Sequence, residues 1–120
     1  MGRYYNGDIS GKFGFASQSS SDGEYFGAVQ SNYVPYVIYN DSIPEAIESL
    51  KELIKEYKKE TKNKKLTINT TSDDFWQMVD TDWYQKKENG LLSSRISMGL
   101  EIVQFNKKYP DDDISFTAEF

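Results

Sequence analysis

Side chains that could bind a ligand are concentrated in the first 27 residues, where tyrosine and glycine recur and aliphatic residues are few. Tyrosine supplies a large contact surface at small entropic cost, and it recurs with glycine and serine in protein recognition loops. We therefore expect a recognition surface here, in which Tyr4, Tyr5 and Tyr25 bury their rings and keep their hydroxyls reachable. The candidate binding residues are Arg3, Tyr4, Tyr5, Asn6, Asp8, Lys12, Asp22 and Tyr25.

A small anion is one ligand that this segment could hold. Residues 7–14 (GDISGKFG) are rich in glycine, and their backbone amides, together with Arg3 and Lys12, could surround one phosphate. The run lacks the full spacing of a P-loop, and no helix is expected to follow it. A nucleotide held in this way, with tyrosine rings stacked on its base, is therefore an alternative to protein recognition.

The residue types that most enzymes use are missing from the chain. It has no histidine and no cysteine, which removes the commonest general base near neutral pH, thiol nucleophiles and thiolate zinc sites. Neighbouring carboxylates occur at residues 73–74, 80–82 and 111–113, but a helix start or a charged turn explains each group. We predict a non-catalytic protein without a metal or another cofactor. An enzyme that uses carboxylate or lysine chemistry stays open as a third hypothesis.

The net charge of −5 is placed mainly in the second half of the chain. Residues 66–120 contain ten acidic and five basic residues, which gives this part a net charge of −5. Because binding to duplex nucleic acid depends on neutralising phosphates, we expect no duplex partner, whereas a basic protein surface would suit this charge. No apolar run is long enough for a membrane helix and no signal peptide is recognisable. We therefore expect a soluble cytoplasmic protein without a membrane partner.

Helical spacing of apolar residues predicts three helices in the middle of the chain. The clearest covers residues 43–60, with a charged outer face that we interpret as a solvated surface. A second is expected at residues 71–87, ended by Gly90. A third, at residues 91–108, is apolar on two sides and should lie between the sheet and another helix. Residues 66–69 are a candidate short strand.

A hairpin is predicted at the N-terminus of the chain. Residues 3–5 and 12–16 are candidate strands, and Asn6-Gly7-Asp8 between them is a turn signal, because Asn and Gly both accept positive φ. The ring of a tyrosine on such a strand would lie against the core, as we expect for the phenylalanines that follow it.

Further strands are predicted at residues 24–30, 33–39 and 114–120. The second contains Pro35, which removes a ladder donor, so we expect either an edge strand or a strand that begins just after the proline. The third alternates apolar and polar residues, as a half-buried strand does. Strands at both ends with helices between them indicate an α+β fold in one domain, residues 1–120. We expect a mostly antiparallel sheet, built from the N-terminal segments and the C-terminal strand and covered by about three helices.

The two ends of the chain resemble a family of small uncharacterised proteins of phages and large DNA viruses. The matching segments are residues 2–9 (GRYYNGDI), 11–13 (GKF), 20–22 (SSD), 26–27 (FG) and 116–120 (FTAEF). Gly14 departs from the pattern, because a larger aromatic residue is expected there. The resemblance implies a viral or prophage origin and suggests that the two ends meet in one structure.

These observations lead to two functional hypotheses. The first is a small non-catalytic binding protein of viral or prophage origin that engages a host protein in the host cytoplasm and inhibits a bacterial defence system. The alternative is a protein that sequesters a small nucleotide ligand. The sequence leaves the oligomeric state open, a homo-oligomer included.

Overall fold

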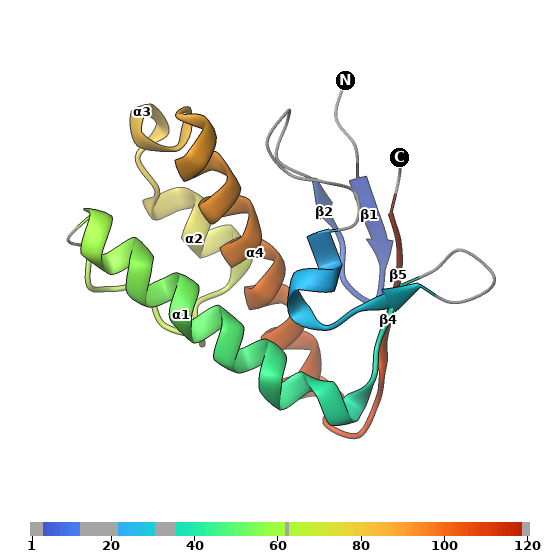
Figure 1. The fold of residues 1–120 in the computed structure, drawn as a ribbon. Coiled ribbons are helices and arrows are strands. Elements are labelled where there is room, and N and C mark those ends of the chain that lie inside the picture. Colours follow the sequence, from blue (N-terminus) through green and yellow to red (C-terminus); the bar gives the residue numbers. More distant parts are fainter. Residues whose placement is uncertain (1–3, 13–21, 31–35, 62, 119–120) are drawn as a thin grey trace.

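The computed structural model describes residues 4–12, 22–30, 36–61 and 63–118, and it confirms the α+β fold (Figure 1). The strands are β1 (Tyr4–Gly7), β2 (Gly11–Lys12), β3 (Val29–Gln30), β4 (Tyr36–Ile38) and β5 (Ile114–Ala118). The helices are α1 (Ile43–Thr61), α2 (Ser72–Met78), α3 (Thr81–Tyr84) and α4 (Lys87–Lys108), with short 3-10 turns η1 (Asp22–Phe26) and η2 (Asn40–Ser42). No helix among these residues is both long and apolar enough to span a membrane.

The two ends of the chain meet in one antiparallel sheet of order β2-β1-β5-β4-β3. The predicted hairpin is present, because β1 pairs with β2, but its turn lies further along the chain than expected. Asn6 and Gly7 belong to β1 and pair with Thr117 and Phe116 of β5. A Cβ atom on Gly7 would lie 2.6 Å from the carbonyl oxygen of Ser115. Glycine is required here for the close approach of β5, and the connection to β2 follows at residues 8–10.

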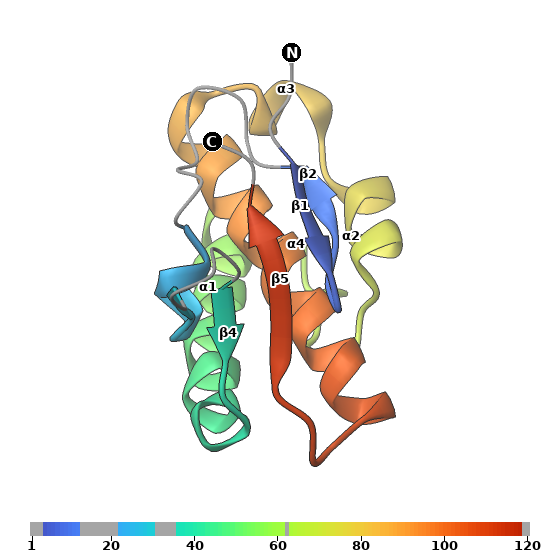
Figure 2. The same cartoon turned by 90° about the vertical axis from the view of Figure 1, so that its right-hand side faces the viewer.

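One face of the sheet carries the core and the other carries no helix (Figure 2). On β5 the side chains of Ile114 and Phe116 are buried, whereas Ser115 and Thr117 are exposed. The predicted alternation of this strand is therefore confirmed over the described residues. The ring of Phe116 stacks on that of Tyr36 at a centroid distance of 5.8 Å, which ties β5 to β4 on the buried face.

The centre of the helical layer is α4, which packs against α1, α2 and α3 (Figure 1) and is buried on both predicted apolar sides. Gly90 lies inside this helix and does not end the preceding one, so the predicted boundary was wrong. The helix expected at residues 71–87 is divided, because Val79 is extended and Asp80 caps a new helix by accepting a hydrogen bond from the Asp82 amide at 3.0 Å. Thr71 caps α2.

Three strand predictions need correction. Residues 24–26 belong to the turn η1, residues 27–28 connect it to β3, and only Val29 and Gln30 are a strand. Residues 66–69 form no strand, because two hydrogen bonds close a turn there. The Thr70 amide donates to the Thr67 carbonyl, and the Thr70 hydroxyl accepts from the Thr67 amide. The strand at 33–39 begins at Tyr36, after the proline as one alternative predicted, but it lies between β3 and β5 and is not an edge. The predicted strand 12–16 lies outside the described residues beyond Lys12.

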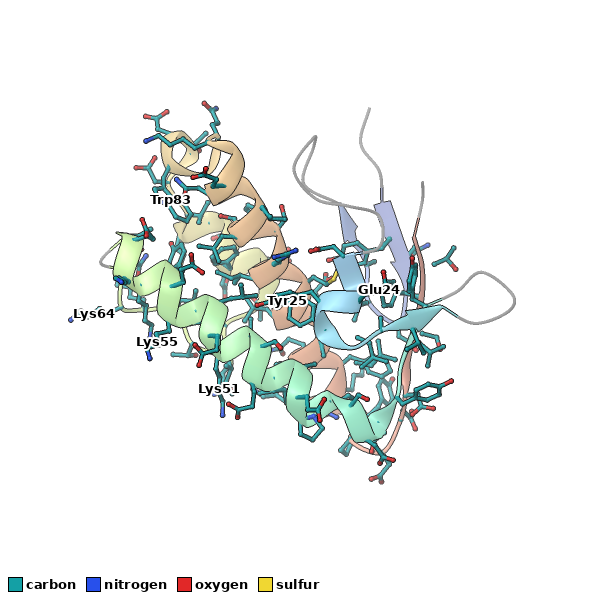
Figure 3. All side chains as sticks on the ribbon, in the orientation of Figure 1. Glu24, Tyr25, Lys51, Lys55, Lys64 and Trp83 are labelled. Atoms are coloured by element: carbon teal, nitrogen blue, oxygen red, sulfur yellow. The ribbon has the colours of Figure 1, made fainter. Side chains whose placement is uncertain are left out.

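The lysine-rich face of α1 is a solvated surface. Lys51 and Lys55 are exposed and point away from the core in Figure 3. Of the pairs three residues apart on this helix, Glu48 and Lys51 form an ion pair at 3.1 Å between two exposed side chains. Such a pair contributes little to stability. This face therefore carries no argument about function.

Candidate functional site

The predicted recognition residues do not form one surface. Tyr5 is only 2% exposed, so its ring belongs to the core, where it contacts Phe116 edge to face. Asn6 is exposed on the sheet. Arg3 lies outside the described residues, as do the side chains of Tyr4 and Lys12, although the backbones of Tyr4 and Lys12 pair in β1 and β2.

Asp22 and Tyr25 meet, but on a residue that the sequence did not single out. Asp22 is buried in η1 and accepts hydrogen bonds from Arg95 Nε at 2.9 Å and from Nη2 at 2.8 Å. The Arg95 guanidinium also lies 4.5 Å from the centre of the Tyr25 ring. Figure 3 shows Tyr25 between η1 and α4. Hydrogen bonding to Asp22 raises the pKa of Arg95. Because two nitrogens of Arg95 bind the Asp22 carboxylate, we assign this ion pair to the attachment of η1 to α4.

A cleft of about 530 Å³ opens between the β1–β2 connection, the start of α2 and the second half of α4. It is within the size range of small-ligand sites. The lining residues are Asp8, Ile9, Ser10, Thr71, Ser72, Asp73, Glu101, Gln104, Phe105, Lys108 and Tyr109. Of the predicted binding residues whose side chains the structure describes, only Asp8 lines this cleft.

Glu101 is the half-buried acid of the cleft, whereas the side chains of Asp8, Asp73 and Lys108 are exposed. Its Oε2 accepts a hydrogen bond from the Tyr5 hydroxyl at 3.0 Å, and its carboxylate accepts another from the Ser10 amide. Burial raises the pKa of Glu101 to about 7, with a smaller contribution from the negative charge of Asp73. The two hydrogen bonds lower this pKa but do not offset the burial.

The Tyr5 hydroxyl is held for this contact. Burial and the charge of Glu101 raise the pKa of Tyr5, so the phenol stays protonated and remains a donor. The backbone of β2 closes over it, since a Cβ atom on Gly11 would lie 2.6 Å from the hydroxyl oxygen. The prediction that the Tyr5 ring is buried is correct, but its hydroxyl reaches Glu101 and is not a free surface group.

The charges around the cleft favour a cation over an anion. Three carboxylates line it, from Asp8, Asp73 and Glu101, and Lys108 is the single cation among the described lining residues. Asp8 also has a structural task, because its Oδ2 accepts a hydrogen bond from the Ser115 amide at 2.8 Å. The cleft therefore offers carboxylates, hydroxyls and two aromatic rings, and this combination suits a basic group with an apolar stem.

The neighbouring carboxylates listed from the sequence are explained by structure. Asp73 and Asp74 lie in the first turn of α2, where an acid is favoured, and Asp80 caps α3. Asp113 accepts a hydrogen bond from the Asn40 amide at 2.7 Å and joins η2 to the connection before β5. Within the described parts of the chain, no group of three acidic residues is placed to hold a metal ion.

Sequence reasoning missed Glu101, although a signal for it existed. Between residues 91 and 106, Arg95 and Glu101 are the only charged residues in a helix that the pattern predicted to be covered on two sides. A charge in such a position is seldom buried without a partner or a function. Arg95 has a charged partner, whereas the hydrogen-bond donors to Glu101 are neutral.

Comparisons of the chain with protein families, curated proteins and solved structures found no match. The candidate site is therefore defined by its own geometry alone.

Proposed function

We propose that the protein is a small non-catalytic binding protein that engages a partner protein through the cleft between the β1–β2 connection, α2 and α4. The observation that carries this proposal is the position of Glu101, a half-buried carboxylate that faces the cleft and whose donors among the described residues, Tyr5 and Ser10, are neutral. A perturbed titratable group that lines a cleft is a physical indicator of a functional site.

The fold itself does not need a charge at this position. A glutamine has the same shape and could accept hydrogen bonds from the Tyr5 hydroxyl and the Ser10 amide without placing a negative charge near Asp73. Burial makes ionisation of the Glu101 carboxyl less favourable than it is in water. Sites that sacrifice stability in this way are typical of binding and catalytic groups. This argument supports a role for the charge of Glu101 in recognition.

A nucleotide ligand is less well supported. Phosphate groups would meet the carboxylates of Asp8, Asp73 and Glu101, with Lys108 as the single cation of the cleft lining. The sequestering hypothesis relied on Arg3 and on the side chain of Lys12, which lie outside the described residues. It stays a prediction that a thermal-shift screen against nucleotides would test, because a specific ligand stabilises the folded state.

The origin of the partner rests on the resemblance of the chain ends to small viral proteins. From it we propose a viral or prophage protein that acts in the host cytoplasm on a host protein, with a bacterial defence component as the expected target. The acidic net charge of −5 favours a partner with a basic surface.

Affinity capture from bacterial lysate with matched variants tests the proposed function. The cleft variant combines Glu101→Gln with Asp73→Asn, and the control combines Glu52→Gln with Glu56→Gln on the exposed face of α1. At pH 8, where Glu101 is ionised, both variants lose two negative charges, so a non-specific charge effect would appear equally in the two. We expect the cleft variant to lose at least about tenfold in affinity for the captured protein, or about 1.4 kcal/mol. Retention equal to that of the wild type would contradict the proposal. Substitution of Tyr5 is unsuitable, because its ring lies in the core.

A further inference from the structure

The Glu101 carboxylate connects three parts of the fold at the cleft. It lies on α4, accepts a hydrogen bond from the Tyr5 hydroxyl of β1 at 3.0 Å, and accepts another from the Ser10 amide of the β1–β2 connection. Ser10 itself lines the cleft. A change in the protonation of this single carboxyl therefore alters both the charge of the cleft and the hydrogen bonds that hold the hairpin against α4.

Five charged or titratable groups of the described residues surround Glu101, and only one of them is a cation. They are Tyr5 from β1, Asp8 from the β1–β2 connection, Asp73 from α2, Lys108 from α4 and Tyr109 just after α4. Lys108 is two helical turns away from Glu101, so it is not a close counter-ion. When Glu101 loses its proton, the cleft gains a negative charge that none of the described side chains of its lining neutralises directly.

We propose that the cleft takes the cationic end of an arginine or lysine side chain of the partner, and that this cation and a proton compete for the Glu101 carboxylate. The inference rests on the proposed function and adds to it the chemistry of the bound group and the control of binding by pH. The stem of such a side chain would lie against the rings of Phe105 and Tyr109, which line the same cleft.

The direction of the pH effect follows from linkage. Because burial raises the pKa of Glu101 to about 7, the carboxyl of the unbound protein is protonated below that pH and ionised above it. A bound cation stabilises the ionised form, so binding releases a proton. Affinity should therefore be weak at pH 5.5, rise through pH 7 and level off near pH 8. For a group with this pKa the expected gain between pH 5.5 and pH 8 is about thirtyfold.

The test uses N-acetylarginine amide as the probe and N-acetylcitrulline amide as a neutral control of nearly the same shape. Binding is followed by NMR through the Ser10 amide, which donates to Glu101 and so reports on the site itself. In the wild type we expect the arginine probe to bind about thirtyfold more tightly at pH 8 than at pH 5.5, and the citrulline probe to bind weakly at both. In Glu101→Gln the arginine probe should bind weakly with no dependence on pH.

A second variant keeps the inference testable if Glu101→Gln alters the fold. Asp73→Asn removes a neighbouring charge that raises the pKa of Glu101, so the midpoint of the pH profile should move to lower pH while Glu101 is still present. Equal binding of the two probes, or arginine binding that is the same in wild type and Glu101→Gln, would overturn the inference. Arginine binding that depends on Glu101 but not on pH would overturn the competition with the proton. The proposed function fails separately, if the cleft variant retains the captured partner.

Discussion

Replacing Glu101 with glutamine should stabilise the protein at pH 8 and leave its stability at pH 5 little changed. In the folded protein burial raises the pKa of Glu101 from 4.5 to about 7, so between these pH values the folded chain holds a proton that the unfolded chain has lost. Stability from this group is therefore fully present below about pH 4.5 and is lost as the pH rises through 7. Glutamine mimics the protonated form at every pH.

The size of the effect follows from that difference in pKa. At 1.36 kcal/mol per pH unit, the rise from 4.5 to about 7 corresponds to at most about 3 kcal/mol. Glu101 is only half-buried, and water that reaches the cleft screens its charge. We therefore expect Glu101→Gln to raise the free energy of unfolding by about 1 to 2 kcal/mol at pH 8 and by less than about 0.5 kcal/mol at pH 5.

Urea unfolding at half-unit steps from pH 5 to pH 8 measures this difference. Other carboxylates titrate in the wild type and the variant alike, so subtracting the two curves isolates position 101. Glu52→Gln, an exposed substitution of the same chemistry on α1, should give a flat difference curve. Parallel curves for wild type and Glu101→Gln over the whole range would refute the burial argument. A variant that is less stable at pH 8 would show that the ionised carboxylate strengthens the fold.

Three further substitutions test contacts that hold the fold together. Arg95→Leu leaves Asp22 buried without its guanidinium partner and should cost about 3 to 5 kcal/mol by urea unfolding, whereas Arg95→Leu combined with Asp22→Leu should recover part of the loss. Gly7→Ala places a Cβ 2.6 Å from a β5 carbonyl oxygen and should cost about 1 to 3 kcal/mol, with lost amide protection along β1 in hydrogen exchange. Thr71→Ala removes the α2 cap and should lower the free energy of unfolding by about 1 kcal/mol, with Thr71→Ser retaining most of it.

Features of the fold that depend on neighbours in sequence could be predicted from the sequence. The apolar spacing of α1 and the alternation of β5 each repeat within one element, so the sequence of that element was sufficient to predict it. Segments whose conformation depends on distant partners were misread. The end of the segment 22–26 has the composition of a strand. The segment nevertheless forms the turn η1, where Asp22 is bound by Arg95, a residue 73 positions further along the chain. Tertiary contact decided the structure there.

The cleft was less predictable than the fold, for the same reason. Its lining residue Glu101 accepts a hydrogen bond from Tyr5, and the two residues are 96 positions apart in the chain. Composition alone placed the expected site on the exposed hydroxyls of the N-terminal tyrosines. The structure instead buries the Tyr5 ring and uses its hydroxyl to hold a carboxylate of α4. The local signal was an isolated acidic residue in an apolar helix. The part of the fold that this residue faces follows only once its neighbour in the sheet is known.

The two charges of α4 show why Glu101, and not Arg95, is assigned to recognition. Both lie in the apolar part of the helix and both attach an N-terminal segment to it. Arg95 forms a bidentate ion pair with the buried Asp22, so its charge is neutralised within the fold and a partner would have to break that pair. Among the described residues, Glu101 receives hydrogen bonds from the neutral donors Tyr5 and Ser10 only, so no described cation balances its charge at the cleft. A cation brought by another molecule would supply the counter-charge that the fold omits.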